Sequence, residues 1–210
     1  IASVLALILY LTNAPFHPTV VSALGLLDRI TSPASMLVIG CVLIPGARTP
    51  KLVTEEMVMK MKSHFVPYYN EHIDDCTRPY PGIIGMLDAL AAKGIRFAVA
   101  SNKYQEGTEA LVRKYFGKYD FVRILGQRDG KPIKPDPAIV HEAMSGIEGI
   151  KAEEVVYCGD SDVDMQTGIN AGVRTVGVAW GFRTREELSA YDPWLLVEKA
   201  EEITDALMRD

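Results

Sequence analysis

The sequence predicts an α/β protein in which a parallel sheet carries helices on both faces, beside a small helical cap. From residue 95 onward, short apolar runs of strand length alternate with amphipathic stretches of helical period. Each of these apolar runs is followed by polar or glycine residues. Strands that alternate with helices in this order join by right-handed crossovers into a parallel sheet. The expected core is therefore Rossmann-like.

Two helices precede the alternation. The first starts at Thr54 and ends near Tyr69, and the second carries Ile84, Leu87 and Leu90 on one face. Four buried strands follow, with helices between them: Ile95–Ala100, Phe121–Leu125, Val155–Cys158 and Thr175–Ala179. Pro137 opens the helix that precedes the third strand, and Gly172 ends the one that precedes the fourth.

Charge and cysteine content exclude several classes of protein. The chain has 22 Lys and Arg against 27 Asp and Glu, a net charge of -5, which is the wrong sign for a protein that neutralises nucleic-acid phosphates. Its three cysteines show no metal-finger spacing and suit a reducing compartment. We therefore expect a cytoplasmic protein that binds no nucleic acid.

Residues 1–46 have an unusual composition, with Asp28 and Arg29 as their only charged side chains. Their apolar runs, Ala2–Leu11 and Met36–Ile44, are shorter than the roughly 20 residues that cross a bilayer as a helix. No basic segment precedes the first run, so we expect neither a signal peptide nor a membrane partner. We assign residues 1–77 to the helical cap region and residues 78–210 to the α/β core.

Three polar clusters lie at or near the ends of predicted strands, where α/β proteins bind their ligands. The clusters are Ser101-Asn102, Lys134 in the segment Lys134-Pro135-Asp136-Pro137, and the acidic run Asp160, Asp162 and Asp164. A hydroxyl near helix N–H groups suits an anion, a constrained ammonium suits a phosphate, and a few carboxylates suit Mg²⁺. Taken singly, a helix cap, a solvated loop lysine and an acidic helix start would explain them as well.

In this order the three clusters resemble motifs two, three and four of the haloacid dehalogenase superfamily. The chain is most similar to bacterial phosphoglycolate phosphatase-type members, and the resemblance runs from about Pro45 to the C-terminus. The segments that carry it are Arg78-Pro79-Tyr80-Pro81-Gly82, Val99 to Gln105, Leu125-Gly126-Gln127-Arg128 and Trp180-Gly181-Phe182-Arg183.

The resemblance implies a Mg²⁺-dependent phosphatase that acts on a small phosphorylated metabolite, 2-phosphoglycolate by default. Ser101 and Asn102 would bind the substrate phosphate, and Lys134 would pair with the phosphoryl oxygens as a catalytic residue. Asp160 and Asp164 would hold Mg²⁺. Because the role of Lys134 is electrostatic at the phosphate, we expect it to matter for turnover and not for stability.

One motif of the superfamily is missing. Its members carry a DxDGT-type segment at the end of a central first strand, and the first Asp is the nucleophile of an aspartyl-phosphate mechanism. This sequence contains no DxD followed by Gly-Thr. We therefore expect the chain as it stands to be inactive, and we expect the sheet to lack its central strand.

Several alternatives remain open. The chain could be a non-catalytic remnant that binds phosphate or Mg²⁺, or a phosphomutase or dehalogenase of the same superfamily. A phosphoryl-accepting receiver domain would place its lysine after the acidic cluster, whereas Lys134 precedes it. For residues 1–46, a reading-frame error and a genuine replacement, with Met36–Ile44 as a surrogate strand, are both considered.

Overall fold

The computed structural model describes residues 55–209, and the unusual segment 1–46 therefore lies outside the described residues. The chain divides into two compact units, Ile1–His72 and Ile73–Asp210. The described part of the first unit is one helix, α4 (Glu55–His72). The proposed boundary between a cap and a core at residues 77 and 78 stays a prediction.

The second unit alternates strands and helices along the chain. A helix and two strands come first: α5 (Ile83–Ala92), β1 (Phe97–Tyr104), α6 (Gln105–Phe116) and β2 (Phe121–Gln127). The remainder is α7 (Ala138–Met144), a 3-10 turn (Ala152–Glu154), β3 (Val156–Gly159), α8 (Asp162–Ala171), β4 (Arg174–Val178), α9 (Arg185–Ser189), β5 (Leu195–Val197) and α10 (Ala200–Leu207). Among the residues described, no helix is long and apolar enough to cross a membrane.

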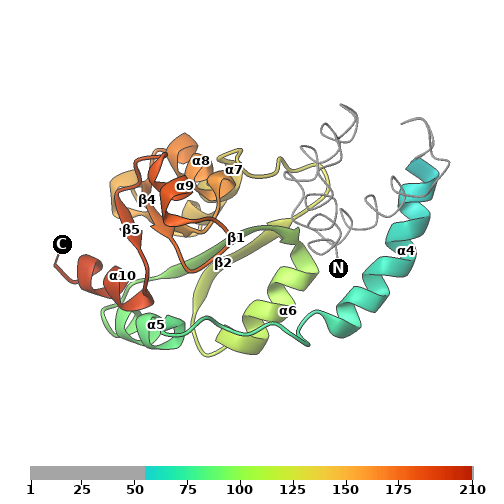
Figure 1. The fold of residues 1–210 in the computed structure, drawn as a ribbon, viewed down its shortest axis with the longest axis horizontal. Coiled ribbons are helices and arrows are strands. Elements are labelled where there is room, and N and C mark those ends of the chain that lie inside the picture. The colour runs from blue at the N-terminus through green and yellow to red at the C-terminus, as the bar shows by residue number, and fades with distance from the viewer. Residues whose placement is uncertain (1–54, 210) are drawn as a thin grey trace, which may run out of the picture. The chain divides into compact units, whose positions relative to one another are not determined.

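All the strand pairs of the described region are parallel, which confirms the predicted fold class. The strands nevertheless form two hydrogen-bonded groups, β1-β2 and β3-β4-β5, and not one sheet (Figure 1). Within residues 55–209, β1 and β3 each stand at the edge of a group. No strand within residues 55–209 pairs with both groups, and the expectation that the sequence lacks a central strand stays a prediction.

A hydrophobic cluster contacts both groups of strands. This cluster combines Leu125 of β2 with Ile139 and Val140 of α7, and with residues that flank β4; Ala100 of β1 and Tyr157 of β3 pack against it. Helix α7 contacts β1, β2 and α8, so it bridges the groups on one face. A second cluster is formed by residues of β4, β5 and α10: Val176, Val178, Val197 and Ile203.

Strand β1 contains an irregularity that bears on the site. Ala100 pairs with Leu125, and Tyr104 pairs with Gln127, so four positions of β1 match two positions of β2. The residues between, Ser101 to Lys103, therefore form a bulge. Bulges redirect side chains and are common beside functional sites. The sequence prediction ended this strand at Ala100, whereas the structure continues it past the bulge to Tyr104.

We predict that Leu188→Ala lowers the free energy of unfolding by about 2–5 kcal/mol, because a fully buried leucine leaves a cavity when it is truncated. Leu188 has 0% of its surface exposed, on the short helix α9. Urea unfolding of the full chain measures the loss. Ile169→Ala is the control, since Ile169 is exposed, and its effect should stay within about 0.5 kcal/mol. Equal effects of the two variants would contradict this core assignment.

Candidate active site

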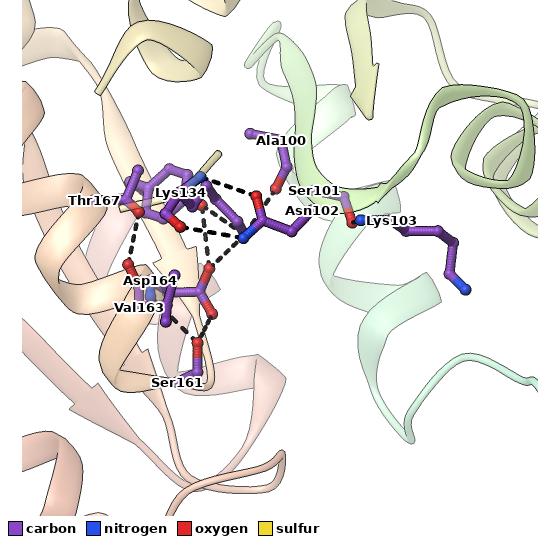
Figure 2. A network of polar contacts seen from close by, with 10 residues as sticks. Ala100, Ser101, Asn102, Lys103, Lys134, Ser161, Val163, Asp164 and Thr167 are labelled. Atoms are coloured by element: carbon purple, nitrogen blue, oxygen red, sulfur yellow. Dashed lines mark hydrogen bonds and ion pairs between the residues drawn. The ribbon is translucent and has the colours of Figure 1, made fainter. Parts of the chain in front are cut away.

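The ammonium group of Lys134 lies at the centre of the candidate site. Its Nζ donates to Asp164 Oδ1 at 2.7 Å, to the carbonyl oxygen of Ala100 at 3.2 Å and to the Tyr157 hydroxyl at 3.2 Å (Figure 2). The three acceptors come from β1, β3 and α8. The side chains of Lys134 and Asp164 are only 11% and 10% exposed. One buried ion pair thus ties both groups of strands to a helix.

Asn102 holds the main chain of Lys134. Its side-chain nitrogen donates to the Lys134 carbonyl at 3.2 Å, and its Oδ1 accepts the Lys134 N–H at 2.9 Å. Ser101, beside it in the bulge, accepts the Lys103 N–H at 3.1 Å through its hydroxyl. Both residues were expected to bind a phosphate. In the structure the Asn102 amide is engaged with Lys134, and the Ser101 hydroxyl stabilises the local turn.

Asp164 is fixed by the first turn of α8. Ser161 is the N-cap of this helix: its Oγ accepts the Asp164 N–H at 3.2 Å and donates to Asp164 Oδ2 at 2.5 Å. Tyr157 contacts Asp164 Oδ1 at 3.2 Å through its hydroxyl. A Cβ at Gly159 would overlap the Asp164 side chain, so only a glycine lets the carboxylate approach the end of β3.

The pKa values of the two central carboxyl groups move in opposite directions. Burial alone would raise the pKa of Asp164, but the charge of Lys134 and the hydrogen bonds from Lys134, Ser161 and Tyr157 hold it below its usual value. Burial, then the charge of Asp164, raises the pKa of Asp160. Burial and the nearby Asp164 also raise the pKa of Tyr157, which keeps its hydroxyl protonated.

The third carboxylate of the acidic run is held separately. Arg183 Nε lies 3.0 Å from Asp162 Oδ1, and the Asp162 side chain is 41% exposed. Asp160 instead accepts the Phe182 N–H at 3.1 Å through Oδ2. The structure therefore brings Lys134 and Asp164 together with Asn102 nearby, and electrostatics couple Asp160 to Asp164, while Asp162 turns to another partner.

The carboxylates fit a magnesium site that completes its coordination with water. Burial and the charge of Asp164 raise the cost of ionising Asp160, and a cation would offset that cost. Within the described residues, no group of three or more His, Cys, Asp or Glu side chains is arranged to hold a metal. Mg²⁺ commonly uses one or two protein carboxylates and keeps several waters, so a two-carboxylate set is sufficient for it.

Sequence reasoning missed two contributors to this site. Tyr157 was assigned only as part of a buried strand, although it is the one hydroxyl-bearing residue in Val155–Cys158 and precedes the acidic run by three positions. The segment Trp180–Arg183 was noted only for its resemblance to a family. Its contact with Asp160 follows from the pairing of β3 with β4, which brings the ends of both strands together.

Comparison with known proteins identifies the class and then the family. The fold is an α/β fold with parallel strands, and the profile of the haloacid dehalogenase-like hydrolases matches residues 44–178. The chain belongs to this haloacid dehalogenase-like hydrolase family. A second profile, the C-terminal domain of alanine dehydrogenase/PNT, matches residues 21–66, most of which lie outside the described region.

Two curated relatives are phosphatases. Pyrophosphatase PpaX of Halalkalibacterium halodurans is 27% identical over 168 residues, which cover 80% of this chain and 77% of that protein. A phosphoglycolate phosphatase of Pasteurella multocida is 26% identical over 179 residues, covering 85% of this chain and 80% of that protein. Their shared feature is hydrolysis of a small phosphorylated compound.

Solved structures agree with this assignment. A protein from Lactobacillus delbrueckii subsp. bulgaricus, provisionally named phosphoglycolate phosphatase, superposes with a TM-score of 0.65 at 35% identity, over 76% of this chain and 66% of that one. A predicted phosphoglycolate phosphatase from Haemophilus somnus gives a TM-score of 0.66 at 26% identity, over 74% of this chain and 68% of that one. The described fold is therefore that of a phosphatase family.

The buried ion pair changes the expectation that Lys134 does not affect stability. We predict that Lys134→Met lowers the free energy of unfolding at pH 7 by about 3–5 kcal/mol, because it leaves a buried carboxylate uncompensated. The double variant Lys134→Met/Asp164→Asn should recover part of this loss. Lys131→Met is the control: Lys131 is 55% exposed, so its removal should cost at most about 1 kcal/mol.

The loss should depend on pH. The lowered pKa of Asp164 means that its ionised form stabilises the fold above the unfolded value of about 3.9, and that this contribution disappears as pH falls through the folded value. The difference between wild type and Lys134→Met should therefore shrink as pH falls below about 4. Urea unfolding at pH 7 and at low pH tests this. An equal loss at both would assign the effect to packing and not to charge.

Proposed function

We propose that this chain carries the phosphate-binding and cation-binding parts of a Mg²⁺-dependent phosphatase site for a small phosphate monoester, with 2-phosphoglycolate as the first candidate. The observation that carries the proposal is the buried Lys134 ammonium, which contacts Ala100 of β1 and Tyr157 of β3 and pairs with Asp164. A buried cation beside carboxylates suits a ligand that brings both a phosphate and a metal ion. The phosphatase relatives support the same chemistry.

In this proposal Lys134 neutralises phosphoryl oxygens, and the bulge of β1 positions it. Asn102 fixes the Lys134 main chain through its two hydrogen bonds, so the direction of the ammonium is set before a ligand arrives. Ser101, whose hydroxyl lies in the same bulge, supplies a further hydrogen bond to the phosphate. The three residues thus act at one edge of β1, as a binding surface for an anion.

Asp160 and Asp164 form the cation-binding part of the proposed site. Asp160 would ligate Mg²⁺, and Asp164, whose oxygens contact Lys134, Tyr157 and Ser161, would support it from the first turn of α8. When bound, Mg²⁺ offsets the repulsion between the two carboxylates and the negative charge of the substrate phosphate. The raised pKa of Asp160 is consistent with this role, because a bound cation would stabilise the ionised form of its carboxyl group.

A second candidate is a protein that binds phosphate and Mg²⁺ without turnover. The observation in its favour is the absence of any Asp-x-Asp-Gly-Thr segment in the sequence, which leaves the site without the family's nucleophile. Both candidates predict ligand binding, and only the first predicts hydrolysis once a nucleophile is supplied. Phosphate release and phosphate binding must therefore be measured separately.

We predict that Asp160→Asn weakens Mg²⁺ binding by about tenfold or more, since it keeps the shape of the ligand and removes its charge. Asp162→Asn is the matched control, because Asp162 is paired with Arg183 and partly exposed. Its Mg²⁺ affinity should stay within about twofold of wild type. Calorimetric titration of the full chain with MgCl₂ measures both. Unchanged affinity in Asp160→Asn, or equal losses in both variants, would rule out the assigned cation site.

We also predict that the chain with this sequence releases little or no phosphate from 2-phosphoglycolate or inorganic pyrophosphate in the presence of Mg²⁺. Without the nucleophile, a positioned cation and Lys134 cannot form the covalent intermediate. A colorimetric assay for released phosphate tests this, with calorimetric binding of inorganic phosphate measured in parallel. Rapid Mg²⁺-dependent hydrolysis would show that another residue supplies the nucleophile. Failure to bind phosphate at all would remove the proposed site.

A further inference from the structure

The segment Gly181–Arg183 lies against Asp160, although the mechanism above gives it no role. It follows β4, which pairs in parallel with β3 through Gly159 and Gly177. Asp160 comes directly after β3, and Gly181 lies three residues beyond the end of β4. Because neighbouring parallel strands end at the same side of a sheet, the two segments meet there.

Two backbone N–H groups of the segment donate hydrogen bonds to Asp160. The Arg183 N–H donates to the Asp160 carbonyl oxygen at 3.0 Å, and the Phe182 N–H donates to Asp160 Oδ2 at 3.1 Å. One bond therefore fixes the main chain of Asp160, and the other fixes the rotation of its carboxylate. Hydrogen bonds from fixed backbone donors to a charged oxygen are among the stronger ones in proteins.

Gly181 leaves the space that this arrangement needs. A Cβ at residue 181 would overlap the carboxylate of Asp160 and also its Cβ. Gly181 is not among the glycines with a positive φ, so its backbone conformation is open to other residues. Only the closeness of Asp160 requires a glycine here. Since the Asp160 Cβ is attached to the end of a strand, rotation of the carboxylate alone would not remove the overlap.

Arg183 completes the segment by engaging the neighbouring acid. Its Nε lies 3.0 Å from Asp162 Oδ1, and its guanidinium lies 4.9 Å from the centre of the Phe182 ring. The Arg183 side chain is only 20% exposed. The segment thus contacts Asp160 through the backbone N–H groups of Phe182 and Arg183, and Asp162 through the Arg183 side chain. The carboxylates of Asp160 and Asp162 therefore have different partners.

We infer that Gly181–Arg183 is a positioning element that orients the Asp160 carboxylate for a divalent cation, with Gly181 acting through Asp160. The inference rests on the proposed function, because it takes Asp160 as a cation ligand. Groups that orient a metal ligand usually change metal affinity by about 10- to 100-fold when they are altered. Gly181 therefore controls cation affinity without contacting the cation.

The test is Gly181→Ala in the full chain, titrated calorimetrically with MgCl₂. Mg²⁺ affinity should fall by about 10- to 100-fold. Gly85→Ala is the matched control, because a Cβ at Gly85 in α5 meets no atom within 4 Å. Its Mg²⁺ affinity should equal that of wild type. Thermal unfolding with EDTA, measured on each variant, separates loss of the cation site from loss of the fold.

The outcomes distinguish this inference from the proposed function. If Asp160→Asn binds Mg²⁺ as wild type does, the proposed cation site is wrong. If Asp160→Asn weakens binding and folded Gly181→Ala does not, the positioning role is wrong. If Gly181→Ala fails to fold, Asp160→Gly/Gly181→Ala should fold again, because the overlapping side chain is gone. A double variant that stays unfolded would overturn the claim that Gly181 acts through Asp160.

Discussion

The buried ion pair between Lys134 and Asp164 is the interaction on which the rest of the site depends. Removing two charges from water costs several kcal/mol for each, and their attraction compensates only where hydrogen bonds satisfy the remaining donors and acceptors. The structure meets that condition: Ala100 and Tyr157 accept from the ammonium, while Ser161 donates to the carboxylate. The local structure holds both members of this pair, since Asn102 fixes the main chain of Lys134 and the first turn of α8 fixes Asp164.

Asp160 and Asp164 show how one short sequence creates two different carboxyl groups. Four positions apart, Asp160 is partly buried and Asp164 is buried, and of the two only Asp164 has an ammonium beside it. Its pKa falls while that of Asp160 rises. Separation of neighbouring pKa values is a common property of functional sites. Here it leaves Asp160 as the group whose ionised form gains most from an added cation.

Four of the five described strands and the three polar clusters could be predicted from the sequence, because apolar runs of four to six residues with polar ends have few alternative structures. Strand β5 was missed, since Leu195–Val197 is too short for any periodicity. The engagement of Asn102 with Lys134 could not be predicted either. It depends on the bulge in β1, where the pairing with β2 is irregular and the side chains of Ser101 to Lys103 change direction. The residue types in this segment do not indicate a bulge.

The division of the strands into two groups has a consequence for local stability. In a parallel ladder, successive residues hydrogen-bond alternately to the strands on either side. Strand β4 has a partner on both sides, whereas β1 and β3 have one each within the described residues. Among the described strands, the amides of β4 are therefore protected against hydrogen exchange by strands on both sides, and those of β1, β2, β3 and β5 by a strand on one side. Ala100 of β1 and Tyr157 of β3 both accept hydrogen bonds from Lys134, so the Lys134 ammonium links the two groups of strands where no described backbone pairing does.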